Sequence, residues 1–333
     1  MDTRVKKILW FAVSTAIIAG MIYFADIGRF LNAIATANGW FLIPAFILGF
    51  SVFPVWAFVW YRFFMKLDIQ VSYPESLQIF FAGQFMNSVT PIGQFGGEPF
   101  MAYIISRNTE ASYEKSLSIS LSSDIVNSIP VFSFVIGGAA YLVAFSTLNQ
   151  LILKTVYFAL LILIFGGAFV YFLWFRSGAI ENRILGIASR ISEIVGRGKG
   201  LVDSLESKLD EIEKSFEIIG RDRRSLLKIV AFAHLGFVFS VFCLYSILLS
   251  VGFSPDFTPL YFILALSSLG NFSPTPGGSG TYEALMAGLL SFFLGINFAT
   301  ALVVAIIFRL TTFWPGLIVG YLFLNKIEKG DSL

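Results

Sequence analysis

The chain has 333 residues, of which 56% are hydrophobic, 17% aromatic and only 13% charged, and its mean hydropathy is +0.79. Soluble domains carry about 25% charged residues, so this composition excludes a water-soluble protein and predicts a polytopic membrane protein. The formal net charge of +2 hides a skew, because residues 176–228 hold 11 of the 23 Lys and Arg and 9 of the 21 Asp and Glu. We expect that segment to lie in water. The single cysteine, Cys243, excludes a disulfide framework, and with the single histidine, His234, it is interpreted as a packing residue.

Six stretches are long and apolar enough to span a membrane, which takes about 20 residues each. They are residues 8–25, 40–61, 116–146, 150–175, 226–251 and 298–324. Lys and Arg gather before the first of these, on both sides of the charged loop and after the last. By the positive-inside rule, this predicts a multi-pass protein of the cell (plasma) membrane with both termini and the loop 176–228 in the cytoplasm. Trp40 and Trp60 lie near predicted span ends and are expected to be interfacial anchors.

Two further apolar regions, residues 75–106 and 259–296, are each cut in half by proline and glycine. Each begins and ends on one side of the membrane, and arms of about 10 to 16 residues are shorter than the bilayer core requires. We interpret both as re-entrant helical hairpins, with a pair of short tilted spans as the alternative. Irregular backbone at this depth must be buried in protein or line a polar cavity. Pro74 and Pro259 suit the first turn of the helix that opens each hairpin.

The two hairpins share a motif. Residues 88–98 read SVTPIGQFGGE and residues 273–283 read SPTPGGSGTYE, so Ser, Thr, Pro, Gly and Glu coincide at one offset of 185 residues (273 − 88 = 185). The same offset takes Pro130 to Pro315. Because the two hairpins enter from opposite sides, the offset predicts an inverted-topology repeat, the architecture in which broken half-helices meet around a substrate site.

The expected fold is therefore all-α, with about six spanning helices and two re-entrant hairpins in one transmembrane domain. The repeat copies cover approximately residues 40–146 and 225–331. Within the charged loop, the stretch LVDSLESKLDEIEKSFEII has the apolar spacing of an amphipathic helix. Such a helix would lie on the membrane surface or against the bundle.

Polar residues of the hairpins are the candidate substrate-binding residues. The tip glycines allow positive φ, and free N–H groups at the start of each second arm favour a small anion such as a phosphate headgroup. Glu98 and Glu283 stand in the first turn of those arms, where they either mark a pathway or cap the helix. The remaining hairpin residues expected to line the site are Gln84, Asn87, Thr90, Gly93, Gln94, Asn271, Thr275 and Gly278.

Asp124 and Arg309 are the other charges well inside predicted spans, and they too are 185 residues apart (309 − 124 = 185). An intramembrane ion pair between them would serve either as a structural lock between the halves or as part of the substrate site, where Arg309 suits a phosphate. Nearby hydroxyl and amide groups would add donors to such a pair: Ser122, Ser123, Asn127, Thr311 and Thr312. We expect no catalytic residue, no metal site and no cofactor.

The segments TPIGQFGGEPFMAYII and NFSPTPGGSGTYEALMAGLLSFF, with the charged loop between them, resemble the lysylphosphatidylglycerol synthase transmembrane-domain family, also called the flippase-like or UPF0104 family. The resemblance covers nearly the whole chain. In the multiple-peptide-resistance proteins of that family, such a domain translocates aminoacylated phosphatidylglycerol, and a separate soluble domain makes the lipid. The resemblance implies a stand-alone member without that synthase domain, so synthase activity is not carried over. Related domains lie fused or adjacent to glycosyltransferases, which implies a glycosyltransferase or another lipid-modifying enzyme as a partner.

The function expected from these features is that of a membrane lipid translocase. It would move an anionic or modified phospholipid, a glycolipid or a polyprenyl-phosphate-linked lipid between leaflets, with no nucleic acid as a partner. Two alternatives stay open. One is a membrane subunit or enzyme of lipid-linked glycosyl or acyl transfer, and the other is a coupled carrier for a small solute.

Overall fold

The computed structural model describes residues 27–89, 94–145, 200–273 and 275–328, together with residues 153, 157, 160, 161 and 164. Every regular element in this part of the chain is helical. The elements are α2 (Ile27–Ala35), α3 (Gly39–Lys66), α4 (Tyr73–Val89), α5 (Gln94–Asn108), α6 (Tyr113–Phe145), α9 (Gly200–Arg221), α10 (Arg223–Ser250), α11 (Thr258–Ser267), the 3-10 turns η1 (Ser268–Phe272) and η2 (Pro276–Gly278), α12 (Thr281–Leu294), α13 (Phe298–Thr312) and α14 (Trp314–Glu328).

Four helical stretches of the described chain are long and apolar enough to cross a membrane. They are Gly39–Lys66, Tyr113–Phe145, Arg223–Ser250 and Phe298–Ile327. Each coincides with one of the six expected spans. The other two, residues 8–25 and 150–175, lie outside the described residues apart from a few isolated positions. An all-α polytopic fold is therefore confirmed, and the total number of spans stays a prediction.

The two proline- and glycine-rich regions form helical hairpins, one from α4 and α5 and the other from α11, η1, η2 and α12. The longer arms have 17, 15 and 14 residues in α4, α5 and α12. At 1.5 Å per residue these arms are about 21 to 26 Å long, less than the roughly 30 Å of a hydrocarbon core. Pro74 and Pro259 are each the second residue of their helix, as predicted. Re-entry of both hairpins stays a prediction.

Helix starts follow the sequence offset. The separations are 184 residues for α3 and α10 (223 − 39), 185 for α4 and α11 (258 − 73), 187 for α5 and α12 (281 − 94) and 185 for α6 and α13 (298 − 113). One difference lies in the last pair, because α6 runs on through Pro130 whereas its counterpart is split into α13 and α14 just before Pro315. The split lets α14 take its own direction.

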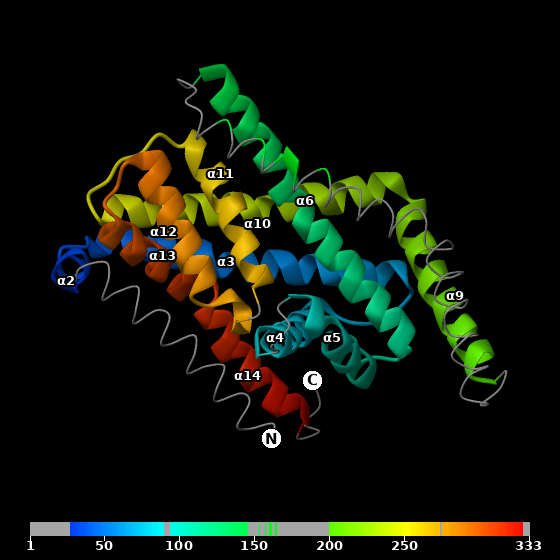
Figure 1. Cartoon of the computed structure of the whole chain (residues 1–333). Helices are drawn as coiled ribbons and strands as arrows, with labels where there is room; N and C mark the ends of the chain where they lie inside the picture. The colour runs from blue at the N-terminus through cyan, green and yellow to red at the C-terminus, as the bar shows by residue number, and fades with distance from the viewer. Residues whose placement is uncertain are drawn as a thin grey trace, which may run out of the picture.

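A central pair of helices organises the bundle: α3 and α10 lie side by side, and α6 crosses both (Figure 1). Helices α11, α12 and α13 gather along one half of this pair, and α4 and α5 lie by the other half. From the end of α13, α14 reaches back to pack on α4. Gly320 permits this contact, because a Cβ there would overlap the carbonyl oxygen of Phe81. This contact joins the C-terminal end of the second half to the hairpin of the first half.

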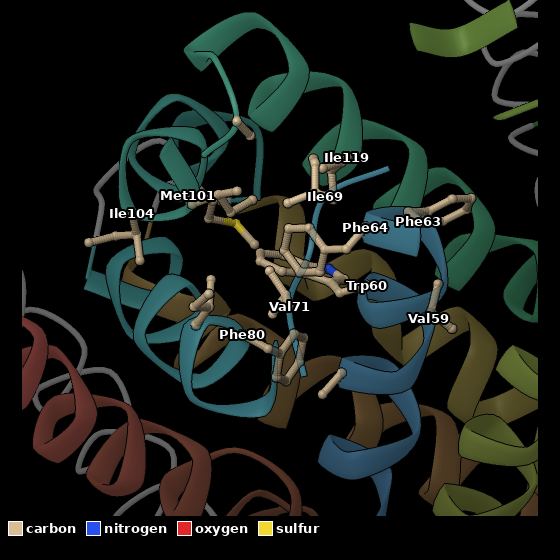
Figure 2. Packing of buried hydrophobic residues seen from close by; sticks show 14 of the residues in the cluster. Val59, Trp60, Phe63, Phe64, Ile69, Val71, Phe80, Met101, Ile104 and Ile119 are labelled. Carbon is tan, nitrogen blue, oxygen red and sulfur yellow. The ribbon is translucent and has the colours of Figure 1, made fainter. Parts of the chain in front are cut away.

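Close packing of large apolar side chains fills the space between α3, α4, α5 and α6 (Figure 2). Inside a bilayer, helices gain little from leaving lipid, so shape complementarity must hold them together. Trp60 is fully buried at the centre of this cluster, with the Phe80 ring 5.4 Å away in an edge-on arrangement. Its predicted place at the interface is therefore wrong. The reason is that its side of α3 faces α4, where the Phe80 ring lies.

The amphipathic helix of the charged loop is confirmed as α9, and its C-terminal part packs against the bundle. Ile219 is fully buried, and Lys66 Nζ donates a hydrogen bond to its carbonyl oxygen at 3.2 Å. An ammonium group close to the last carbonyls of a helix is favoured by the helix dipole. Ser112 Oγ of the α5–α6 connection donates to Glu211 Oε1 at 2.6 Å. Of the two predicted positions for this helix, its C-terminal part therefore takes the one against the bundle.

Candidate functional site

Glu283 and Arg309 form a buried ion pair beside the tip of the second hairpin. Arg309 Nε donates to Glu283 Oε1 at 3.3 Å, and the Gly280 N–H donates to Glu283 Oε2 at 2.6 Å. Arg309 Nη2 also donates to the carbonyl oxygen of Gly277 at 2.6 Å. The Glu283 carboxylate therefore caps α12 and neutralises the guanidinium at the same time. The predicted anion position at the start of α12 is filled by the chain's own carboxylate.

Two aromatic rings fix the orientation of that guanidinium. The Arg309 Cζ lies 3.7 Å from the centroid of the Phe313 ring and 4.9 Å from that of Tyr282. Cation–π contacts of desolvated groups are worth about 2 kcal/mol or more. Phe313 is the residue at which α13 and α14 separate, so the helix break places this ring.

The predicted ion pair between Asp124 and Arg309 is wrong, because the partner of Arg309 is Glu283. Both members of the observed pair come from the second repeat copy, so the pair holds α12 to α13 and does not lock the two halves together. The hydroxyls of Thr311 and Thr312 add no donor to this pair either. They donate to the carbonyl oxygen of Phe308 in their own helix, at 2.8 and 2.7 Å.

Glu98 and Asp124, at the matching positions of the first copy, are neighbours of each other. Ser120 Oγ donates a hydrogen bond to Glu98 Oε2, and Asp124 stands one turn after Ser120 on the same face of α6. Glu98 is only 6% exposed, and no described residue forms a hydrogen bond with its Oε1. Neither carboxyl group forms a salt bridge with any residue that the structure describes. The first copy thus places two acids where the second places an acid and a base.

Further oxygens around these two acids also lack partners. On α6, the Ser123 Oγ and the Asn127 Oδ1 are buried and make no hydrogen bond. On α4, the Asn87 Oδ1 is buried and unpartnered as well. Asn87 lies against Gly97, the residue before Glu98, so closely that a Cβ on Gly97 would overlap it. The polar residues predicted for the first hairpin and for α6 therefore meet in one region.

The tip of the second hairpin is compact. Gly278 has a φ of +69°, and a Cβ there would lie 2.6 Å from the carbonyl oxygen of Gly270. The hydroxyls of Ser273 and Thr275 share a hydrogen bond of 2.7 Å, and Asn271 is half-buried in η1. The tip of the second hairpin touches the arms of the first, since η2 contacts α4 and η1 contacts α5. The tip of the first hairpin, residues 90–93, lies outside the described residues, so the meeting of the two tips stays a prediction.

Four more of the predicted residues belong to the first hairpin. Gln84 is half-buried on α4, and Gln94 is the first residue of α5. Thr90 and Gly93 lie outside the described residues.

An open apolar groove of about 500 Å³ adjoins the first hairpin. Two of its wall residues are chain neighbours of the buried polar ones, because Met86 precedes Asn87 and Pro99 follows Glu98. The groove is lined by Met86, Pro99, Phe100, Tyr103, Ile104, Tyr113 and Leu324. A polar, buried cluster thus stands directly beside an apolar surface that is open to the outside.

Sequence reasoning missed several contacts of this region. Ser120, which binds Glu98, stands four residues before Asp124, and that spacing could have placed both on one face of α6. Tyr282 and Phe313, which bracket Arg309, carry no sequence signal for that role, and neither does the carbonyl oxygen of Gly277. Backbone groups and packing rings become visible only when the chain is folded.

Residues 11–320 match the protein family described as "Lysylphosphatidylglycerol synthase TM region". A UPF0104 membrane protein of Pyrococcus horikoshii is 24% identical over 329 residues, covering 96% of this chain and 97% of its own. Another from Methanothermobacter thermautotrophicus is 23% identical, covering 96% and 92%, and one from Archaeoglobus fulgidus is 27% identical, covering 94% of each. The names of these relatives state a membrane protein and no enzymatic activity.

Proposed function

This chain belongs to the lysylphosphatidylglycerol synthase transmembrane-region family, and on that premise we propose that it is a flippase-like lipid translocase of the plasma membrane. Its substrate in this proposal is an anionic or modified phospholipid, a glycolipid or a polyprenyl-phosphate-linked lipid, which moves between leaflets. A lipid-modifying enzyme or a glycosyltransferase would supply that lipid. The membership itself supports only a membrane role related to lipids.

One observation carries the proposal: the buried polar residues of the first hairpin lie beside the open apolar groove. A lipid has a polar headgroup and apolar tails, so a protein that moves it needs a polar region reached from an apolar surface. Glu98 and Glu283 are 6% and 2% exposed, and buried carboxyl groups in a membrane bundle are costly and usually functional. The groove begins at Pro99, one residue from Glu98. The headgroup would then lie in the polar region and the tails in the adjacent apolar groove.

The outer face of α5 extends this arrangement toward the helix end. Phe100, Tyr103 and Arg107 follow one another at spacings of three and four residues, so they share a face. Phe100 is 45% and Tyr103 54% exposed, and Arg107 is exposed in the last turn. An acyl chain along the two rings would bring its phosphate to the Arg107 guanidinium, which suits phosphate oxygens. We propose Arg107 as the first headgroup contact, on the cytoplasmic side.

The repeat gives the proposal a route across the membrane. Matched helix starts in the two halves support two copies of one unit, and inverted copies place their hairpins around a central site. In this proposal both hairpins are re-entrant, both termini are cytoplasmic, and the headgroup passes between the tips while the tails stay in lipid.

The test is leaflet exchange of a fluorescent phosphatidylglycerol in liposomes that contain the purified full chain, read out by quenching of the outer leaflet. We expect exchange above that of protein-free vesicles, and a rate about tenfold lower for Arg107→Gln, which corresponds to about 1.4 kcal/mol. Arg224→Gln is the matched control, because Arg224 is an equally exposed arginine in the first turn of α10, away from the groove. Absence of exchange for a panel of anionic lipids and glycolipids, with protein that is folded, would overturn the proposal.

A further inference from the structure

The translocase proposal uses Glu98 as part of the polar region, but it leaves open what balances the charges of the acidic cluster, which we define as Glu98, Ser120, Ser123, Asp124 and Asn127. Two acids in this cluster face each other with no described basic residue bound to either. A charged side chain inside a membrane bundle is normally paired with an opposite charge. No described residue supplies that opposite charge, so the compensation comes from a bound cation or from a proton shared by the two carboxyl groups.

The helix geometry brings the oxygens of this cluster together. Ser120, Ser123, Asp124 and Asn127 occupy positions i, i+3, i+4 and i+7 of α6, which form one face. The hydrogen bond from Ser120 to Glu98 shows that this face is turned toward α5. From α4, Asn87 reaches the same place, since it lies against Gly97. Oxygens from α5 and α6 thus meet, and Asn87 of α4 lies one residue away along α5.

The unpartnered atoms indicate the sign of the ligand. Glu98 Oε1, Asn127 Oδ1 and Asn87 Oδ1 are buried without hydrogen bonds, and oxygens of these kinds act as acceptors when the carboxyl is ionised. Ser123 Oγ, in a fully buried residue, is unpartnered too. Buried acceptors need a donor or a positive charge. An anion could accept a hydrogen bond from the Ser123 hydroxyl, but it would leave the three carboxylate and amide oxygens unsatisfied.

In the second repeat copy, a residue of the chain itself supplies the positive charge beside the hairpin glutamate. There the position of Asp124 is taken by Arg309, and the guanidinium binds Glu283, the counterpart of Glu98. One copy therefore carries a built-in cation next to its hairpin glutamate. The other has a second acid in that position.

We infer that the acidic cluster binds a hard metal cation, held by the carboxylates of Glu98 and Asp124 and by neutral oxygens of Ser123 and Asn127. Carboxylate and amide oxygens are the ligands that Ca²⁺ and Mg²⁺ prefer. Two ionised carboxylates are balanced outright by a divalent ion, whereas Na⁺ balances them only together with a proton. Cation binding is a property of the cluster alone and goes beyond lipid movement.

The experiment measures the thermal unfolding midpoint of the detergent-solubilised full chain in CaCl₂, MgCl₂ or NaCl, against N-methyl-D-glucamine chloride at equal ionic strength. We expect at least one metal chloride to raise the midpoint by several degrees, with saturation. Glu98→Gln is expected to need at least tenfold more of that cation for half the effect. Glu217→Gln, which removes an exposed acid of α9, is expected to respond like the unmodified chain. The three salts separate the divalent ions from Na⁺.

Asp124→Arg provides a second variant, because it recreates in the first copy the acid–base pair of the second. We expect this variant to fold without added metal and to lose the response to the cation. The inference is overturned when the unmodified chain has the same midpoint in all four chlorides, or when the metal-dependent shift persists in both Glu98→Gln and Asp124→Arg.

Discussion

Arg309 Nε lies 3.3 Å from Glu283 Oε1 in a pair that is almost fully buried, and the two residues are 26 positions apart. Glu98 and Asp124 have the same separation (124 − 98 = 26) and are also neighbours. In both halves, then, the first turn of the second hairpin arm packs its glutamate against the helix that follows. Both halves therefore place a hairpin glutamate next to the following helix, but the residue it meets there is Arg309 in one half and Asp124 in the other.

Breaking the pair between Glu283 and Arg309 is expected to destabilise the protein strongly. Removing one partner leaves a buried charge uncompensated, which costs about 3 to 5 kcal/mol. We expect Glu283→Gln and Arg309→Gln each to lose about that much in denaturant unfolding, with a double variant that costs clearly less than the sum. The charge swap Glu283→Arg with Arg309→Glu is expected to recover part of the loss. Strictly additive single effects would contradict the pairing.

The contact between α14 and α4 depends on Gly320. Because a Cβ there overlaps the Phe81 carbonyl oxygen, Gly320→Ala is expected to cost about 1 to 3 kcal/mol by overpacking. Gly288 of α12 is the control, since a Cβ there meets nothing within 4 Å and the residue is exposed in a helix interior. Gly288→Ala is expected to stabilise by up to about 1 kcal/mol. We expect the thermal unfolding midpoint to fall in Gly320→Ala and to rise in Gly288→Ala. Equal shifts in the two variants would argue against this packing.

Two glycines with nearly equal backbone angles separate conformational strain from steric overlap. Gly278 and Gly295 have φ of +69° and +68°, but only Gly278 has a backbone oxygen 2.6 Å from the position of a Cβ, whereas Gly295 has open space. Gly295→Ala is expected to cost about 1 kcal/mol, the penalty of the left-handed region. Gly278→Ala is expected to cost at least twice as much and to disturb the hairpin tip. Similar losses for both variants, measured by unfolding, would show that the tip is looser than described.

The first hairpin begins with a capping box, in which Ser72 N–H donates to Glu75 Oε2 at 2.7 Å and Glu75 N–H donates to Ser72 Oγ at 3.4 Å. Ser72→Ala is expected to cost about 1 kcal/mol. The backbone N–H of Ser72, with help from its hydroxyl, lowers the pKa of Glu75. The stability that this carboxylate contributes is therefore complete above its ordinary pKa of 4.5 and is lost as pH falls through the lowered value. Midpoints of the unmodified chain and Glu75→Gln are expected to differ at pH 7 and to converge in acid. A constant difference would rule out the carboxylate as the cause.

Local signals in the sequence were sufficient to predict the helices and hairpins. Composition predicts an all-α membrane protein, apolar length predicts α3, α6 and α10, and Pro74 and Pro259 mark the first turns of α4 and α11. The 185-residue offset also predicts which helix of one half matches which helix of the other. The helices and their first turns depend on near neighbours in the chain, and the offset depends on comparing two segments of sequence, so neither requires knowledge of the packing.

The partners of the buried polar groups were decided by tertiary structure. The offset relates Asp124 to Arg309, but equivalent positions in a repeat are not contacts, and the hairpin glutamates take those places. Trp60 is buried because its side of α3 packs against α4. By itself, the sequence determined which residues carry charge inside the membrane. Only the folded chain decided which of those charges is neutralised, because contact across helices depends on helix direction and on how closely glycines such as Gly97 and Gly320 let backbones approach.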